Sequence, residues 1–321
     1  MDRSRMGAAA FLCGLALSWA VVGEAPAQGT GVRAPAAKLY RFPGADSNDD
    51  ALPSVVYYVS GDHRPNSKQP AGPGNMPSPG RDLGVMRFDT GTKKWTRDRY
   101  GSPAGTNEAD LIFGMKLYAP ADGEVVTCWR NAPENPKPGG VLPERDGCGD
   151  DDKDGNVCDD FKTCSCTIPR SGNHLNIKTA DGSVMLIAHL KSGSIPAELC
   201  PKTGIYVKDA NAGPVHDGAY YDDIYVPAGS RPKIYRGQYI GRSGNTGASS
   251  GPHTHVHLKP CDSCDAIPFQ FENARRQEVS MDPQANADPA KWVPLKGALL
   301  PEQDPGQKRE IIKPDLPPPQ K

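Results

Sequence analysis

The chain has 321 residues, of which 23% are charged, and its formal net charge is -1 at neutral pH. Because there is no excess of positive charge, the sequence gives no electrostatic basis for nucleic-acid binding and excludes that class of partner. Glycine contributes 35 residues, proline 33 and aromatic residues only 7%, which favours short strands and long loops over helices.

The first 27 residues have the three parts of an export signal. Arg3 and Arg5 give a positive start, residues 8–22 are apolar, and Ala25-Pro26-Ala27 is a small-residue cleavage site. The apolar stretch is too short, and the sequence after it too polar, to favour a stable membrane span. We therefore expect a secreted or periplasmic protein after cleavage near Ala27.

The rest of the chain divides into a central domain and two polar ends. Residues 28–84 are predicted to be an N-terminal extension that is mostly loop, with one edge strand over residues 54–59. Residues 85–275 form the predicted β domain. Residues 276–321 contain a Pro-Pro-Pro run and almost no apolar periodicity, so we expect a disordered tail.

Within the domain, short runs of β-type residues alternate with turn signals, and no long amphipathic helix pattern interrupts them. This pattern predicts an all-β fold, either an antiparallel sheet or an open barrel. Two insertions, over residues 130–170 and 191–236, are longer than the usual hairpin connections. The expected strands cover residues 115–118, 124–129, 174–178, 184–189, 239–241 and 254–258.

Of the nine cysteines, all except Cys13 follow the signal, and most lie in or beside the two insertions. An even number in an exported protein predicts disulfides, although the sequence does not fix their pairing. Cys261 and Cys264 could also form a redox or zinc motif, but neither a second pair at zinc-ribbon spacing nor a thioredoxin-like pattern accompanies them. A structural disulfide is the better interpretation. The cysteines concerned are Cys128, Cys148, Cys158, Cys164, Cys166, Cys200, Cys261 and Cys264.

An acidic stretch in the first insertion has the spacing with which a calcium-binding loop begins. Asp150, Asp152 and Asp154 alternate with other residues, and a glycine and Asn156 follow. Alternate oxygens can surround one hard cation while the glycine permits a sharp turn. Phe161 replaces the glutamate that usually closes such a loop, so a solvated acidic loop is the alternative. Calcium is therefore a candidate cofactor with a stabilising role.

A pair of histidines enters the last predicted strand in the segment Gly251-Pro252-His253-Thr254-His255. Side chains alternate along a strand, so His253 and His255 lie on one face and can converge on a metal ion or a reacting group. With the glycine-rich run over residues 237–247, this segment resembles the end of the M23 family, the LytM/lysostaphin-type zinc endopeptidases that cut peptidoglycan.

Three upstream segments strengthen this resemblance. Residues 172–177 and Ala188-His189-Leu190 are similar to the family's central strand pair and its Tyr-Ala-His-Leu signature. Residues 117–126 resemble its first core strands, with a tight turn at Asp-Gly. The four segments occur in the family's order and cover residues 105–260, about half of the chain.

The resemblance implies a zinc metalloendopeptidase that hydrolyses the peptide cross-bridges or stem peptides of peptidoglycan. Such a site uses three protein ligands and keeps one position open for water. By resemblance, His255 is a zinc ligand, His253 is the general base, and His189 stabilises charge on the substrate carbonyl. Histidine suits the last two roles because its pKa lies close to the working pH.

The family's upstream His-x-x-x-Asp motif is incomplete in this chain. Asp110 is the candidate for its aspartate ligand, but Asn107 stands where a histidine is wanted. Three other histidines are candidates for the missing ligand, and for each the alternative is a surface or hydrogen-bonded histidine. They are His63, His174 and His257.

The incomplete motif leaves a second function open, a catalytically degenerate domain that binds the cell wall or regulates a hydrolase. A third interpretation, a biotinyl/lipoyl-type barrel, rests on residues 119–123 and 237–241. It lacks a modifiable lysine at a hairpin tip. The expected partner is peptidoglycan or another peptide substrate, and the oligomeric state does not follow from the sequence.

Overall fold

The computed structural model describes residues 39–45, 52, 54–63, 80–140, 170–200, 218–220, 229–261, 264, 266–267, 269–295 and 308–315. All of these residues belong to one compact unit that spans residues 37–321. The described part of the chain consists of strands and two single-turn 3-10 helices, η1 (Asn107–Ala109) and η2 (Pro289–Lys291). In these ranges, neither helix is long and apolar enough to cross a membrane.

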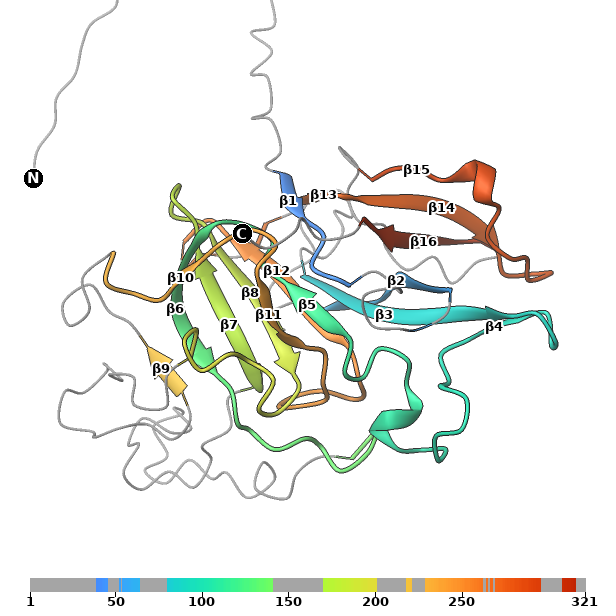
Figure 1. The fold of residues 1–321 in the computed structure, drawn as a ribbon, viewed down its shortest axis with the longest axis horizontal. Helices are drawn as coiled ribbons and strands as arrows, with labels where there is room; N and C mark the ends of the chain where they lie inside the picture. The colour runs from blue at the N-terminus through green and yellow to red at the C-terminus, as the bar shows by residue number, and fades with distance from the viewer. Residues whose placement is uncertain are drawn as a thin grey trace, which may run out of the picture. The chain divides into compact units, whose positions relative to one another are not determined.

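The main sheet has strand order β10-β6-β7-β8-β12-β3-β2-β16-β14-β15, with β4 paired to β3 and β9 paired to β6 (Figure 1). Neighbouring strands in it are antiparallel, so the predicted all-β fold with an antiparallel sheet is confirmed. Its strands are β2 (Val55–His63), β3 (Gly80–Asp89), β4 (Lys94–Thr96), β6 (Gly123–Trp129), β7 (Asn173–Lys178), β8 (Val184–Leu190), β9 (Gly218–Tyr220), β10 (Lys233–Ile234), β12 (Thr254–Lys259), β14 (Ala274–Ser280), β15 (Val293–Pro294) and β16 (Lys308–Pro314).

Two smaller sheets accompany the main one. Strands β5 (Lys116–Tyr118) and β11 (Tyr239–Arg242) pair antiparallel. Strands β1 (Leu39–Arg41) and β13 (Gln270–Glu272) pair in parallel. The six strands predicted in the central domain correspond to β5, β6, β7, β8, β11 and β12, with ends that differ by one residue at most.

The compact unit begins well before residue 85, the predicted start of the domain. Strand β2 is not an edge strand, because it pairs with β3 on one side and with β16 on the other. Its Tyr57 is buried and packs edge-on against Phe42, with ring centroids 5.2 Å apart. The region predicted to be mostly loop therefore supplies part of the core.

The predicted disordered tail is also wrong over residues 308–314, which form β16 and pair with β14 along seven residues. Ile311 and Ile312 are both fully buried, but in different clusters on the two faces of the sheet. Each face therefore receives a single isoleucine from this strand. The sequence shows no apolar alternation there, which is why the strand was not predicted.

Replacing Ile312 by alanine is expected to destabilise the fold by about 2–5 kcal/mol, because it leaves a cavity in the main core. Lys313, its exposed neighbour in β16, is the matched control. Lys313→Ala is expected to change stability by less than about 0.5 kcal/mol. Urea unfolding followed by tryptophan fluorescence measures both. Equal midpoints for the two variants would mean that β16 contributes nothing to the core.

Two disulfides occur among the described residues, as predicted from the even number of cysteines. Cys128 in β6 is bonded to Cys200, and Cys261 is bonded to Cys264 just after β12. The other four cysteines after the signal lie outside the described residues, as do the predicted signal peptide and the calcium-loop candidates Asp150, Asp152, Asp154 and Asn156. Calcium binding therefore stays a prediction.

Candidate functional site

Three histidines from neighbouring strands meet near one end of the main sheet. His189 is the last residue but one of β8, His255 lies in β12, and His253 immediately precedes β12. The ring centroid of His189 is 4.6 Å from that of His253 and 6.2 Å from that of His255. The structure thus brings together the three histidines that the sequence singled out.

The carboxylate that contacts these histidines belongs to Asp82 in β3. Its Oδ1 atom is 2.8 Å from Nδ1 of His255 and 3.6 Å from Nε2 of His253. The reason is the strand register, in which β12 lies between β8 and β3 and pairs His255 with Ala188 on one side and Asp82 on the other. Directly opposed residues of antiparallel strands project on the same face, so Asp82 and His255 are held together.

Asp110, the predicted aspartate ligand, lies in a different environment. Its Oδ2 accepts a hydrogen bond of 2.7 Å from the guanidinium of Arg97. Burial raises the pKa of Asp110, and Arg97 opposes this shift. Asn107, which stands where a histidine was wanted, is buried and bonds to Asn135 and Asn245. Asp110 and Asn107 therefore connect loops to one another. Asp82 provides the acidic oxygen beside His255.

The three alternative histidines are placed differently from one another. His257 is buried, and its Nδ1 is 2.9 Å from Nε2 of His255. His174 has its Nδ1 2.9 Å from the carbonyl oxygen of Gly172, and burial lowers its pKa. The backbone of His63 pairs with Gly80 in β3, two residues from Asp82, but its side chain lies outside the described residues. Of the two described side chains, that of His257 contacts His255.

Backbone carbonyls fix the orientation of two of the site rings. Nδ1 of His189 is 2.7 Å from the carbonyl oxygen of Thr246, and Nδ1 of His253 is 2.8 Å from that of Gly251. A carbonyl oxygen only accepts, so each Nδ1 carries a hydrogen, and in a ring with a single hydrogen Nε2 is the atom that can accept a proton. This arrangement suits the uptake of a proton.

The pKa of His189 is held well below its usual range, first by burial and then by the neighbouring His253 and His255. The ring is therefore neutral near neutral pH. With its single hydrogen on Nδ1 facing Thr246, it has none on Nε2 for a substrate oxygen. The charge-stabilising role predicted for His189 would require a second proton on this ring, and that role stays a prediction.

His189 also has an unusual backbone conformation, with φ at +62°. A non-glycine residue in the left-handed region costs about 1–3 kcal/mol and persists only where its surroundings hold it. Here its N–H donates to the carbonyl of Ser171 and its carbonyl accepts from the N–H of Gly244. This conformation occurs one residue before the end of β8 and accompanies the approach of the His189 ring to His253.

The loop that holds His189 depends on one close backbone approach. Gly247 has φ at +69°, and a Cβ atom on it would lie 2.2 Å from the backbone nitrogen of Gly172. Only glycine fits such a position. The contact keeps Thr246 in place, whose hydroxyl accepts from the N–H of Asn173 and whose carbonyl accepts from His189. The glycine-rich sequence thus supports the orientation of His189.

The site fits a zinc ion only in part. Oδ1 of Asp82 and Nδ1 of His255 are oxygen and nitrogen donors of the kinds that zinc prefers, and they lie side by side. Catalytic zinc sites use three protein ligands. Among the residues that the structure describes, no group of three or more His, Cys, Asp or Glu side chains could hold a metal ion. The described residues therefore supply two adjacent donors.

Comparison with known proteins finds similar solved structures at low identity. No family model matches the chain, and no curated protein matches it. A zinc-containing peptidase from Vibrio cholerae is similar at 15% identity and a TM-score of 0.30, over 83% of this chain and 41% of that one. Csd3 of Helicobacter pylori is similar at 12% identity and a TM-score of 0.26, over 72% and 33%.

A third similar structure is a variant of the catalytic domain of the prophage-encoded M23 protein EnpA from Enterococcus faecalis. Its identity is 17% and its TM-score 0.19, over 54% of this chain and 85% of that one. The chain spans less than half the length of the Vibrio and Helicobacter proteins.

Proposed function

We propose that this chain is an exported, zinc-dependent endopeptidase that acts on the peptide cross-bridges or stem peptides of peptidoglycan. The observation that carries the proposal is the convergence of His189, His253 and His255 beside the carboxylate of Asp82. Two proton-accepting imidazoles next to a nitrogen and oxygen donor pair have the chemistry that metal-assisted amide hydrolysis needs.

In this proposal, Asp82 and His255 would hold a zinc ion. Zinc bound here would supply a Lewis acid that activates water and polarises the scissile carbonyl. His253 accepts on Nε2 the proton that the attacking water loses, because its Nδ1 already carries a hydrogen that is bonded to the carbonyl of Gly251. His257 bonds to Nε2 of His255 and so limits the rotation of the ligand ring.

A second candidate function is a degenerate M23-like domain that binds the cell wall or regulates a hydrolase without cutting. The observation that favours it is the small donor set, since the described residues supply two metal donors and no group of three. Such a domain would keep the fold and the histidine cluster. It would bind peptidoglycan without releasing products.

Metal content and turnover of the full-length exported chain separate the two functions. The proposal expects about one zinc per chain, the number a mononuclear catalytic site holds, and the appearance of new amino termini when purified peptidoglycan is incubated with the protein. A chelator should stop the reaction, and added zinc should restore it. A zinc-free protein that binds peptidoglycan but leaves it undigested would favour the second function. A protein that neither binds zinc nor binds peptidoglycan would exclude both.

A further inference from the structure

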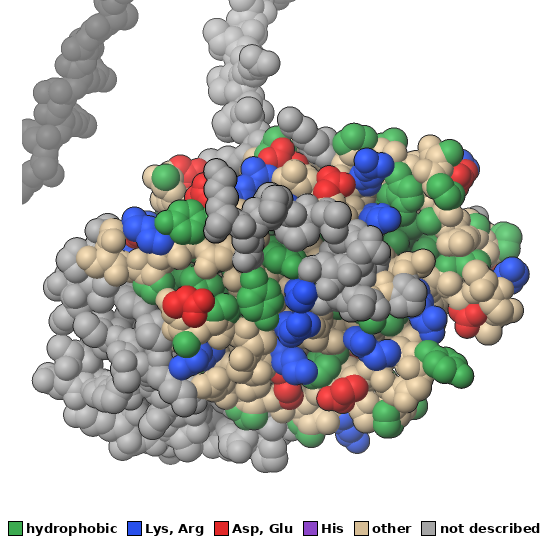
Figure 2. Space-filling model, viewed as in Figure 1, with side chains coloured by type: hydrophobic (Ala, Val, Ile, Leu, Met, Phe, Trp, Pro, Cys, Tyr) green, Lys and Arg blue, Asp and Glu red, His purple; other side chains and the backbone are tan. Residues whose placement is uncertain are grey.

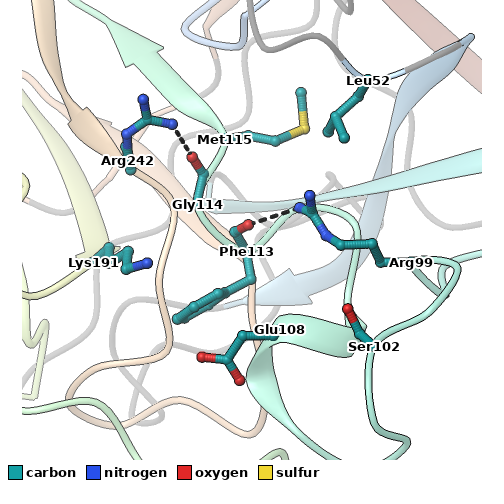
Figure 3. A pocket seen from close by; sticks show the side chains of 9 residues that line it. All are labelled: Leu52, Arg99, Ser102, Glu108, Phe113, Gly114, Met115, Lys191 and Arg242. Carbon is teal, nitrogen blue, oxygen red and sulfur yellow. Dashed lines mark hydrogen bonds between the residues drawn. The ribbon is translucent and has the colours of Figure 1, made fainter.

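A cavity of about 410 Å³ lies apart from the histidines, at the junction of β5, β11 and the loop before β5. Its charged lining consists of Arg99, Lys191, Arg242 and Glu108, and its apolar lining includes Phe113 and Met115 (Figure 3). Lys and Arg side chains gather over β5 and β11 on the face shown in Figure 2. The lining thus has three cationic groups and one carboxylate, and a second carboxylate, that of Glu134, interacts electrostatically with Lys191 and Glu108.

Two of the cationic groups are fixed by backbone carbonyls. Nη2 of Arg99 donates to the carbonyl oxygens of Leu111, at 3.2 Å, and Phe113, at 3.1 Å. Nη1 of Arg242 donates to the carbonyl oxygen of Gly114. Figure 3 shows the two guanidinium groups reaching this stretch of backbone from opposite sides. A guanidinium has five N–H donors in a rigid plane, so Arg99 held in this way still has donors for an anion.

The third cationic group, the ammonium of Lys191, lies over the ring of Phe113. Nζ of Lys191 lies 4.6 Å from the ring centroid of Phe113, and Lys191 itself is half-buried. Partly buried cations attract an anion more strongly than fully solvated ones, because water screens them less. The ring of Phe113 and the side chain of Met115, both largely buried, form the apolar part of the lining beside that anion.

The same backbone segments carry this cavity and the histidine cluster. The N–H of Lys191 donates to the carbonyl of Arg242 at 2.7 Å, and the N–H of Gly244 donates to the carbonyl of His189 at 2.9 Å. Two backbone hydrogen bonds therefore hold residues 189–191 against residues 242–244. A ligand group held by Lys191 and Arg242 would be tied to the backbone that positions His189.

We propose that this cavity binds a free carboxylate of a peptide, with the adjoining aliphatic side chain against Phe113 and Met115. The choice of a peptide rests on the proposed function, since peptidoglycan stem peptides carry free carboxylates. Glu108 at the cavity disfavours a doubly charged group such as phosphate, because like charges repel. A singly charged carboxylate with a small apolar neighbour matches both the net positive charge of the lining and its apolar part at Phe113 and Met115.

The test compares N-acetyl-L-lysyl-D-alanine with its C-terminal amide, two probes that differ only in the carboxylate. Binding to the full chain is measured by NMR chemical shifts after zinc has been removed, so that no cleavage occurs. The free acid should bind at least about tenfold more tightly than the amide, as expected for a charge-assisted hydrogen bond. Lys191→Met should remove this preference. Lys291→Met, which removes an exposed charge that pairs with Asp288 at η2, should retain it.

Equal binding of the acid and the amide, or an unchanged preference in a folded Lys191→Met variant, would overturn the proposal. Tighter binding of inorganic phosphate than of the free acid would overturn the carboxylate assignment. If Lys191→Met unfolds, Arg99→Gln provides the same comparison. Binding of the probes is measured on zinc-free protein, so the test does not depend on the proposed enzymatic activity. If the chain never binds zinc but still prefers the free acid, the carboxylate site is supported and the zinc-endopeptidase function is excluded.

Discussion

Asp82→Asn is expected to abolish zinc binding and turnover, whereas Asp110→Asn is expected to leave both nearly unchanged. The amide oxygen of asparagine is uncharged, and its NH2 group cannot act as a metal donor. The affinity for zinc should fall by more than about 100-fold, since the loss of even an outer partner of a ligand costs about 10–100-fold. Zinc retained after dialysis and the rate of peptidoglycan digestion are the two measurements.

Asp110→Asn is the matched control because it makes the same chemical change at the other candidate aspartate. It weakens the ion pair with Arg97, whose side chain is 52% exposed. The side chain of Asp110 is only 11% exposed, so the loss can exceed the roughly 0–1 kcal/mol of a surface pair, but the asparagine oxygen still accepts a hydrogen bond from Arg97 and the fold should persist. Zinc lost from Asp110→Asn but kept in Asp82→Asn would show that the metal is held by the loop before β5, and Asp82 would then have no direct role.

The contrast between these two aspartates shows how far sequence reasoning reaches. Strands such as β8 and β12 follow from local patterns, because alternation and turn signals lie within ten residues. The pairing of His255 with Asp82 joins positions 173 residues apart and depends on the register of three strands. No local pattern encodes that register. Asp110 is the candidate by resemblance to the family's upstream His-x-x-x-Asp motif, which carries no information about strand register.

The histidines were easier to find than the carboxylate. His253 and His255 share a strand face because side chains alternate along a strand, and His189 lies near the end of a strongly apolar strand. Asp82 had a weaker signal, a charged residue at the start of the apolar run in β3, in a region that was interpreted as loop. His257 also shares this face and contacts His255, whereas the sequence favoured a surface or hydrogen-bonded histidine there.

His253→Gln is expected to retain zinc while turnover falls by about 10²–10⁴-fold, the usual contribution of a general base. Glutamine keeps a polar side chain but cannot take up a proton near neutral pH. The prediction depends on the position of the ring, with Nδ1 on the carbonyl of Gly251 and Nε2 3.6 Å from Oδ1 of Asp82. Single-turnover rates at saturating substrate, with zinc content measured on the same samples, separate the loss of a base from the loss of metal.

Ser249→Ala is the control for this experiment. The hydroxyl of Ser249 lies 3.2 Å from Nδ1 of His253, but the carbonyl of Gly251 is closer and holds the same hydrogen. Removing the hydroxyl should therefore change turnover only slightly. If His253→Gln instead loses its zinc, His253 is the third metal donor, and the base must be sought elsewhere. If turnover is unchanged with zinc in place, His189 becomes the candidate base, because its Nε2 is the other proton acceptor that the backbone orients in this cluster.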